Sequence, residues 1–357
     1  MRRETISLNV GGVMIGSNHP VVVQSMCNTD TRDVFATLKQ IVDLKAAGCQ
    51  LVRLAVVDQE AVDSLAKICK ESSLPVIADI HFDHKLALGS LKAGVSGLRI
   101  NPGNIGAKEK VIQVVEAARD KQIPIRIGVN GGSLDKALLE KYGGLCPEAM
   151  VESALKNIRI LEELNYPWMK VSLKSSNVPM MIKAYESLAN KVNYPFHIGV
   201  TEAGTEKSGL IKSSVGIGIL LHEGIGDTLR VSLTADPVKE IKAGYEILKV
   251  LEMSDRGATF VSCPTCGRTE INLIDLAGKI EGIVEKIDVP ISVAVMGCPV
   301  NGPGEAREAD IGIAGGKKLG LIFKKGKIIK KVPEEELYDE FIKELNKTIR
   351  EYKEQNK

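Results

Sequence analysis

Three cysteines near the carboxyl end of the chain are the residues best suited to carry chemistry. Cys263 and Cys266 are separated by two residues, and Cys298 lies in a segment, residues 297–305, that is rich in glycine and proline. Thiolates hold soft metals and iron–sulfur clusters. Glycines let the backbone wrap closely around a bulky inorganic core. The spacing therefore predicts a thiolate-bound metal or cluster.

This set of cysteines lacks a fourth nitrogen or sulfur ligand. All five histidines precede Cys263, and only two cysteines follow it. A closed structural zinc site needs four such ligands, so the fourth ligand here is a carboxylate, a backbone group or nothing. Glu305 is the best nearby carboxylate, with Glu308 and Asp310 as rivals. We favour an iron–sulfur cluster with an open position for substrate over a zinc knuckle.

The elements that must position such a site divide the chain in two. Before about Leu251, eight short β-branched runs alternate with helical patterns, as expected for a (β/α)8 barrel, with an open doubly wound sheet as the alternative. The expected strands are residues 21–26, 51–55, 76–80, 97–100, 123–128, 168–173, 196–200 and 228–233.

The rest of the chain has a different pattern. Two apolar β patterns, at residues 311–314 and 319–323, precede a turn and a polar helix at 334–353. We therefore predict an α/β fold class: an N-terminal TIM barrel at residues 1–251 that binds substrate, and a smaller C-terminal α+β iron–sulfur domain at 252–357.

Charged and polar side chains come at the carboxyl ends of the expected barrel strands, where barrel enzymes carry their active sites. Residues two apart on a strand point the same way, so several pairs can project into one cavity. Guanidinium groups bind phosphate oxygens through paired hydrogen bonds. The convergence predicts a site for a diphosphate or a similar multiply charged molecule. The residues are Arg53, Asp79, His81, Arg99, Asn101, Arg126, Asn130, Ser172, Lys174, Glu202, Arg230 and Ser232.

Two of these residues have two open interpretations. Asp79 and His81 can form a general acid/base pair, because histidine titrates near neutral pH. They can equally form a buried hydrogen-bonded pair that only shapes the pocket.

Composition limits the other possibilities. Apolar residues make up 44% of the 357 residues and aromatic residues only 4%, which suits a parallel sheet built from Val, Ile, Leu and Ala. The net charge of +2 gives no support for nucleic-acid or membrane binding. The scattered cysteines indicate a reducing, cytoplasmic compartment, and we find no signal peptide or membrane-spanning run.

Several segments together resemble one enzyme family. They are residues 24–31, 78–82, 98–104, 263–268 and 297–305. In combination these segments resemble the 4-hydroxy-3-methylbut-2-enyl diphosphate synthases of the non-mevalonate isoprenoid pathway, in the shorter bacterial form without an inserted middle domain. Cys27 departs from the family pattern, which has threonine there.

The resemblance implies a cofactor, a substrate and partners. A [4Fe-4S] cluster would be held by Cys263, Cys266, Cys298 and, unusually, Glu305. Two electrons from reduced ferredoxin or flavodoxin would open 2-C-methyl-D-erythritol 2,4-cyclodiphosphate reductively, with loss of water. The resemblance also implies a homodimer in which the cluster domain of one subunit closes over the barrel mouth of the other.

The resemblance and the residue pattern together suggest individual roles. Glu305 would leave the apical iron, Glu202 would protonate the departing hydroxyl, and Asp79 and His81 would orient the carbon skeleton. The expected substrate-binding residues are Arg53, Arg99, Asn101, Arg126, Asn130, Lys174, Arg230 and Ser232.

Two other functions compete with this one. The first is a phosphate-binding lyase or pterin-type synthase in which the cysteines are purely structural. The second is a non-catalytic cluster carrier. An open iron would be vulnerable in a carrier, and a colourless zinc protein would favour the first alternative.

Overall fold

A computed structural model describes residues 2–105, 108–298 and 306–356. The chain divides into two compact units, Met1–Met253 and Ser254–Lys357, and each is described by itself below. Among the described helices, none combines the length and the apolar character that crossing a membrane requires.

The first unit is a barrel of parallel strands. The strands are hydrogen-bonded in the order β8-β7-β6-β5-β4-β3-β10-β9, and an isolated parallel bridge between Val171 and Phe196 joins the two ends of this order. This closure confirms the predicted TIM barrel and excludes the open doubly wound sheet. The strands are β3 (Val22–Met26), β4 (Leu51–Ala55), β5 (Val76–Asp79), β6 (Gly97–Ile100), β7 (Ile125–Asn130), β8 (Met169–Lys174), β9 (His197–Ile198) and β10 (Thr228–Leu229).

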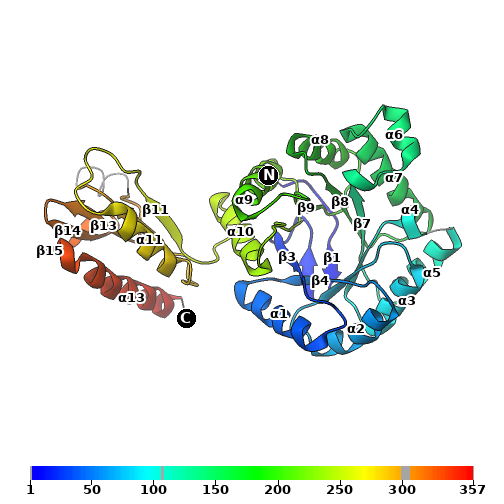
Figure 1. The fold of residues 1–357 in the computed structure, drawn as a ribbon, viewed down its shortest axis with the longest axis horizontal. Coiled ribbons are helices and arrows are strands. Elements are labelled where there is room, and N and C mark those ends of the chain that lie inside the picture. Colours follow the sequence, from blue (N-terminus) through cyan, green and yellow to red (C-terminus); the bar gives the residue numbers. More distant parts are fainter. Residues whose placement is uncertain (1, 106–107, 299–305, 357) are drawn as a thin grey trace. The chain divides into compact units, whose positions relative to one another are not determined.

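Helices surround the strands, as Figure 1 shows. Several begin at an aspartate or asparagine, such as Asp33, Asp58 and Asn177, whose side chain accepts a backbone N–H of the first turn. The helices of the ring are α1 (Val34–Ala47), α2 (Gln59–Glu71), α3 (His84–Ala93), α5 (Lys108–Arg119), α7 (Pro147–Glu163), α8 (Val178–Ala189), α9 (Glu206–His222) and α10 (Pro237–Val250). Shorter helices lie in the loops: α4 (Pro102–Ile105), η1 (Gly131–Ser133) and α6 (Lys136–Tyr142).

Each barrel strand alternates between the helix side and the barrel interior. On β8, Met169, Val171 and Leu173 belong to the apolar core of the barrel unit. The alternate residues of β8 carry polar side chains, and the whole strand is buried. Because successive side chains on a strand point to opposite faces, these polar groups project into the barrel interior.

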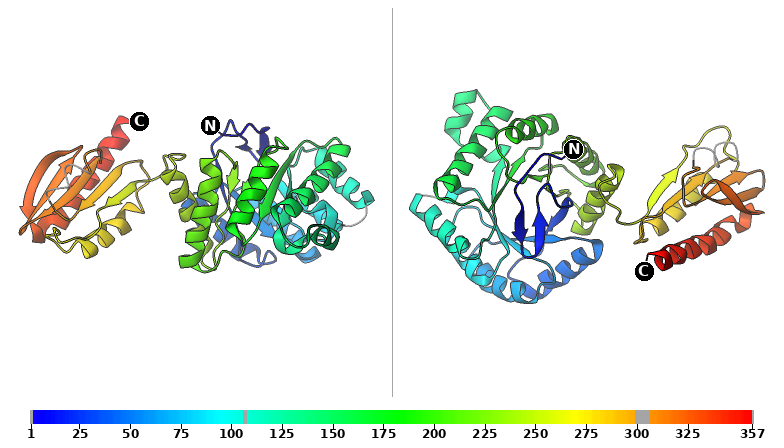
Figure 2. Two further views of the ribbon diagram at one scale, coloured as in Figure 1. Left: turned by 90° about the horizontal axis from the view of Figure 1, so that it is seen from above. Right: turned by 180° about the vertical axis from the view of Figure 1, so that it is seen from behind.

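A hairpin closes the amino end of the barrel. It consists of β1 (Leu8–Val10) and β2 (Val13–Ile15), which the sequence analysis did not predict. Val10 and Ile15 form an apolar cluster with Val22, Leu51 and Ile77 from the first residues of barrel strands. Figure 2 shows the hairpin across this end of the barrel in its right-hand view. The hairpin therefore covers the amino ends of these strands.

The second unit is a five-stranded sheet in the order β11-β12-β13-β14-β15, packed against two helices. The first three strands run parallel and the last two are antiparallel to their neighbours. This arrangement confirms the predicted α+β domain. Its elements are β11 (Thr259–Ser262), α11 (Leu273–Val284), β12 (Ser292–Met296), β13 (Ile311–Gly316), β14 (Leu319–Lys324), β15 (Lys327–Pro333), η2 (Glu334–Glu336) and α13 (Leu337–Gln355).

Candidate functional site

Asp79 lies between two arginines at the carboxyl end of the barrel. Its Oδ2 is 3.2 Å from Nε of Arg53 on β4, and its Oδ1 accepts a hydrogen bond of 3.0 Å from Nη1 of Arg99 on β6. Burial alone raises the pKa of Asp79, but the charges of Arg53, Arg99 and Arg126 outweigh it and hold the pKa at about 2. Asp79 is therefore ionised at neutral pH and fixes the two guanidinium groups.

His81 joins this group through Arg99. Its Nε2 lies 3.1 Å from Nη1 of Arg99 but 3.8 Å from Oδ1 of Asp79. Because a guanidinium group only donates, the histidine nitrogen accepts this hydrogen bond. The side chain of His81 is 59% exposed. Asp79 and His81 thus do not form the direct buried pair that was one of the two interpretations, and a role of His81 as acid or base stays a prediction.

Arg126 and Lys174 add two further basic side chains inside the barrel. Arg126 is buried, and its Nε and Nη1 have no hydrogen-bond partner among the residues that the structure describes. Burial, reinforced by the neighbouring cations, holds the pKa values of Arg126 and Lys174 well below their ordinary values. Arg126 therefore acts on the carboxylate of Asp79 together with Arg53 and Arg99, and Lys174 lies within the electrostatic reach of these three arginines. The interior therefore favours binding of a multiply charged anion.

Arg230 is different, because its charge is already compensated. Its Nε lies 3.3 Å from Oε2 of Glu240 on α10. The carboxylate of Glu240 also accepts hydrogen bonds from the backbone N–H of Leu233 and the hydroxyl of Ser25. Arg230 is thus held rigidly at the carboxyl end of β10. Its predicted contact with substrate stays a prediction.

The remaining predicted barrel residues follow the carboxyl ends of their strands. Oδ1 of Asn101 accepts from the backbone N–H of Gly103 at 3.2 Å. Asn130 pairs in register with Lys174 across β7 and β8, so both side chains face the interior. Ser232 is half-buried just after β10. Glu202 is exposed after β9 with a φ of +52°, a left-handed conformation that non-glycine residues adopt rarely and that clusters at functional sites.

Gly199 makes room for Lys174. A Cβ atom at this position would overlap with the carbonyl oxygen of Arg230 and lie 3.1 Å from Nζ of Lys174, and the φ of +157° disfavours a side chain. We therefore expect Gly199→Ala to lower the free energy of unfolding by at least about 2 kcal/mol, measured by urea denaturation. The matched control is Gly218→Ala on α9, where a Cβ meets nothing within 4 Å. Equal stability of the two variants would refute the close packing described here.

The cysteines of the second unit lie on loops that contact one another. Cys263 directly follows β11, and its Sγ accepts a hydrogen bond of 3.2 Å from the backbone N–H of Gly297. Cys298 is the next residue and is buried. A Cβ at Gly297 would lie 3.0 Å from Cγ2 of Thr269, whose hydroxyl accepts from the backbone N–H of Cys266. Parallel pairing of β11 with β12 therefore brings all three cysteines to one end of the sheet.

The donor set of these loops fits an iron–sulfur cluster. A hydrogen bond from the backbone of Arg268, and the charge of its side chain, lower the pKa of the Cys266 thiol and favour the thiolate ligand. No three His, Cys, Asp or Glu side chains within the described ranges stand close enough to share one metal ion. In a cluster, each thiolate binds a different iron, so its ligands stand further apart.

Three carboxylates, of Glu305, Glu308 and Asp310, were candidates for the fourth ligand, and the structure describes the last two. Glu305 lies outside the described residues. Oδ2 of Asp310 accepts hydrogen bonds of 2.9 Å from the backbone N–H and the hydroxyl of Ser292, at the start of β12. Because Cys298 follows the other end of that strand, Asp310 is committed to the opposite end of the sheet. Glu308 is exposed two residues before Asp310.

Comparison with known families gives the identity of both units. Residues 5–245 match the GcpE TIM-barrel domain, and residues 259–347 match the GcpE protein C-terminal domain. The chain belongs to the GcpE family. This membership agrees with the resemblance inferred from the short motifs and with the two-unit fold.

Curated relatives are similar over nearly the whole chain. One from Clostridium acetobutylicum is 60% identical over 345 residues, which are 97% of this chain and 99% of the relative. One from Geobacter sulfurreducens is 58% identical over 351 residues, 98% of this chain and 99% of the relative. Both are named 4-hydroxy-3-methylbut-2-en-1-yl diphosphate synthase (flavodoxin).

Among solved structures, the 3-dehydroquinate dehydratase from Geobacillus kaustophilus is similar in fold to this GcpE-family chain. Its TM-score is 0.51 at 14% sequence identity, and the match covers 72% of this chain and 100% of that chain. At this identity the likeness shows the barrel fold alone.

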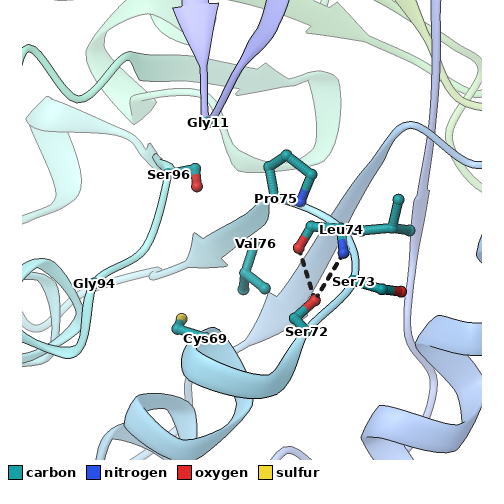
Figure 3. A pocket seen from close by; sticks show the side chains of 9 residues that line it. All are labelled: Gly11, Cys69, Ser72, Ser73, Leu74, Pro75, Val76, Gly94 and Ser96. Atoms are coloured by element: carbon teal, nitrogen blue, oxygen red, sulfur yellow. Dashed lines mark hydrogen bonds between the residues drawn. The ribbon is translucent and has the colours of Figure 1, made fainter.

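A cavity at the other end of the GcpE barrel lacks the features of an active site. It has a volume of about 300 Å³ and lies where the amino ends of β5 and β6 meet the β1–β2 hairpin. Figure 3 shows Cys69, three serines and small apolar residues along its wall, and no lining residue is charged. Burial raises the pKa of the Cys69 thiol to about 12, so this thiol is unreactive at neutral pH.

Two buried charged residues of the barrel unit were missed by the sequence analysis. Glu240 lies on the buried face of α10 beside Ile241. A carboxylate at a position where the helical pattern expects an apolar residue could have indicated its role. Lys170 on β8 is buried, four residues before Lys174 and on the same side of the strand. Its position could have been found by extending the alternation from Lys174 towards the amino end.

Proposed function

We propose that this chain converts 2-C-methyl-D-erythritol 2,4-cyclodiphosphate to 4-hydroxy-3-methylbut-2-enyl diphosphate, the product in the name of its relatives. The observation that carries the proposal is the excess of buried positive charge inside the barrel. Arg53, Arg99 and Arg126 share the single carboxylate of Asp79 there, and the buried amine of Lys174 lies within the electrostatic reach of all three arginines. A diphosphate supplies the negative charge that this arrangement lacks.

The reaction breaks one ring C–O bond at the diphosphate and removes one hydroxyl oxygen as water. Two electrons and two protons balance it, and a carbon–carbon double bond forms. The residues of this chain would bind, orient and donate protons. Arg53 and Arg99, fixed by Asp79, would hold phosphate oxygens together with Arg126 and Lys174.

Other polar residues would complete the substrate site. Asn101, Asn130 and Ser232 are neutral donors at the same end of the barrel, and Arg230 is fixed by Glu240. His81 would contact the carbon skeleton from its exposed position. Glu202 would protonate the departing hydroxyl, because a carboxylic acid in reach can transfer a proton to a leaving group.

Cys263, Cys266, Cys298 and Glu305 would hold a [4Fe-4S] cluster. When bound, such a cluster supplies single electrons and Lewis acidity. The thiols fit this role because their loops contact one another and the pKa of Cys266 is lowered. The electron donor would be reduced flavodoxin, as the relatives' name indicates, or ferredoxin. None of the seven cysteines, all of which lie within the described residues, forms a disulfide, which suits a cytoplasmic enzyme.

The test is turnover by protein purified without oxygen. We expect a brown protein that converts the cyclodiphosphate to the linear diphosphate when dithionite or reduced flavodoxin is supplied. Phosphorus NMR measures this conversion. Omitting the reductant should stop the reaction. A colourless zinc protein without turnover would instead favour a phosphate-binding enzyme with structural cysteines. The proposal also includes the homodimer that the family resemblance implies, and light scattering of the same preparation tests it.

Glu305→Ala tests the proposed fourth ligand. We expect kcat to fall by at least about 100-fold while the cluster is retained, because the three thiolates remain to hold it. Cluster retention is measured by iron and sulfide content and by electron paramagnetic resonance. The change in kcat is measured separately by steady-state kinetics. Full activity of this variant would contradict the ligation by Glu305 and leave the assignment of the three cysteines in place.

A further inference from the structure

A second layer of polar groups lies in the barrel interior, towards the amino end from Lys174. Lys170 precedes Lys174 by four residues on β8 and pairs in register with Arg126 on β7. Both side chains therefore point into the interior. Lys170 is only 2% exposed, and the proposed function has given it no role so far.

The polar atoms of this layer lack hydrogen-bond partners. Nζ of Lys170, Nε and Nη1 of Arg126 and Nε2 of His197 are all buried, and none has a partner in the described part of the chain. A buried donor without a partner costs about 1–3 kcal/mol, and most buried polar groups in proteins are paired. A group of such atoms on neighbouring strands indicates a site that is completed when a ligand binds.

The groups that face Lys170 from the surrounding strands are mostly cationic or neutral. Arg126 on β7 and Arg53 on β4 repel its positive charge. His197 on β9 is buried with its Nδ1 2.8 Å from Oγ1 of Thr228, and burial lowers its pKa well below the ordinary value, so the ring is neutral. Asp227, just before β10, is the anionic group of this set.

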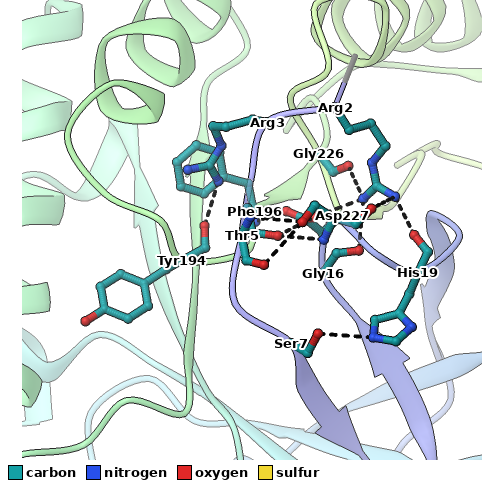
Figure 4. Close-up of polar contacts among 11 residues, drawn as sticks. Arg2, Arg3, Thr5, Ser7, Gly16, His19, Tyr194, Phe196, Gly226 and Asp227 are labelled. Carbon is teal, nitrogen blue, oxygen red and sulfur yellow. Dashed lines mark hydrogen bonds and ion pairs between the residues drawn. The ribbon is translucent and has the colours of Figure 1, made fainter.

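The carboxylate of Asp227 is already occupied by other partners. Figure 4 shows how the N-terminal segment reaches it. Its Oδ1 is 2.9 Å from Nη2 of Arg2 and accepts a hydrogen bond of 3.0 Å from the hydroxyl of Thr5, and its Oδ2 accepts from the backbone N–H of Phe196. Asp227 is therefore largely neutralised by Arg2 and offers little compensation to Lys170.

Burial, followed by the charges of Arg126 and Arg53, lowers the pKa of Lys170 to about 7. The amine therefore loses its proton in the empty barrel when the pH rises above neutrality. A diphosphate held by Arg126 brings negative charge next to this amine and favours its charged form. Ligand binding and protonation of the lysine are then thermodynamically linked.

We propose that Lys170 is a positioning residue of the diphosphate site, which takes up a proton when the cyclic diphosphate binds and supports the anion from behind Arg126. This inference rests on the proposed function. The neutral amine limits the repulsion between cations in the empty barrel. The charged amine then strengthens binding once the ligand is present.

The experiment is calorimetric titration of the protein with the cyclodiphosphate, without reductant so that no turnover occurs. Each phosphorus of this ligand carries one strongly acidic hydroxyl, so the ligand does not titrate between pH 6 and 9. Comparing two buffers with different ionisation enthalpies at pH 8 gives the number of protons taken up. We expect Lys170→Met to reduce the uptake by roughly 0.5–1 proton per site.

Two further variants separate a linked proton from a structural role. Lys170→Arg stays charged at all pH values used, so we expect it to retain tight binding at pH 8 with the reduced proton uptake of Lys170→Met. Between pH 7 and 8.5, the Kd of the wild type should rise by a larger factor than the Kd of Lys170→Arg. The two factors should differ by up to about tenfold. Lys121→Met, which changes an exposed lysine of the same unit, should behave like the wild type.

The outcomes distinguish this inference from the proposed function. Binding with wild-type proton uptake in both Lys170 variants would overturn the inference alone. If Lys170→Met fails to fold, Lys170→Arg still tests the inference, because its proton uptake on ligand binding must be smaller than that of the wild type. Absence of cyclodiphosphate binding by the wild type would overturn the proposed function and this inference together.

Discussion

Cys298→Ser is expected to abolish cluster assembly and to reduce kcat by at least about 1,000-fold. Cys298 is buried next to Gly297, whose backbone N–H donates to Sγ of Cys263. A serine hydroxyl keeps nearly the same shape but is a much weaker ligand for iron than a thiolate. Iron and acid-labile sulfide per chain, together with turnover of the cyclodiphosphate, measure the loss. The barrel should remain folded, because the cysteine belongs to the other unit.

The matched control for this variant is Cys69→Ser. Cys69 lies at the end of α2 in the barrel unit, and its pKa of about 12 keeps it protonated. We expect the control to retain iron, colour and turnover. Full iron content and activity in Cys298→Ser would refute its role as a ligand. Loss of the cluster in both variants would show general instability instead.

The positions of the barrel residues could be predicted where a short-range rule applies. Alternation along a strand is such a rule, and it placed Ser172 and Lys174 on one side of β8. The same rule reaches Lys170, but the sequence analysis considered only the carboxyl ends of strands. The hairpin at residues 8–15 covers the amino end of the barrel, and no sequence motif predicted it.

Contacts between distant segments could not be predicted. Arg2 meets Asp227, and Ser25 meets Glu240, across more than 200 residues of sequence. Such pairs depend on the closure of the barrel, which no local pattern encodes. They affect the electrostatics of the site, because Glu240 forms an ion pair with Arg230, whereas Nε and Nη1 of Arg126 have no hydrogen-bond partner among the described residues. The sequence therefore indicated an anion site, but only the structure shows which of its cations already have a partner.

Geometry in the cysteine unit was predictable in part. The spacing of the three cysteines predicted a common site, but their proximity depends on the parallel pairing of β11 with β12. β11 is four residues long and mostly exposed, so its pattern was too weak to be recognised as a strand. The contact of Gly297 with Thr269 also requires that pairing.

Asp79→Asn is expected to destabilise the barrel by about 3–5 kcal/mol and to raise KM for the cyclodiphosphate. The substitution keeps the size of the side chain but removes the negative charge between Arg53 and Arg99. Two buried guanidinium groups would then repel each other without compensation and lose their fixed orientation. Urea denaturation at pH 7 measures the loss of stability. Steady-state kinetics measure the change in KM.

The pH dependence of the same variant gives a second, independent result. The pKa of Asp79 is about 2 in the folded protein, below its ordinary value of 3.8, so its contribution to stability is fully present above about pH 4. That contribution, about 2 kcal/mol, is lost as the pH falls towards 2. The wild type should therefore lose more stability than Asp79→Asn between pH 5 and pH 2.5. Asp120→Asn, at an exposed position, should follow the wild type. If the free energy of unfolding changes with pH in the same way for all three proteins, Asp79 does not compensate the charges of the arginines. That result would also contradict the electrostatic basis of the anion site.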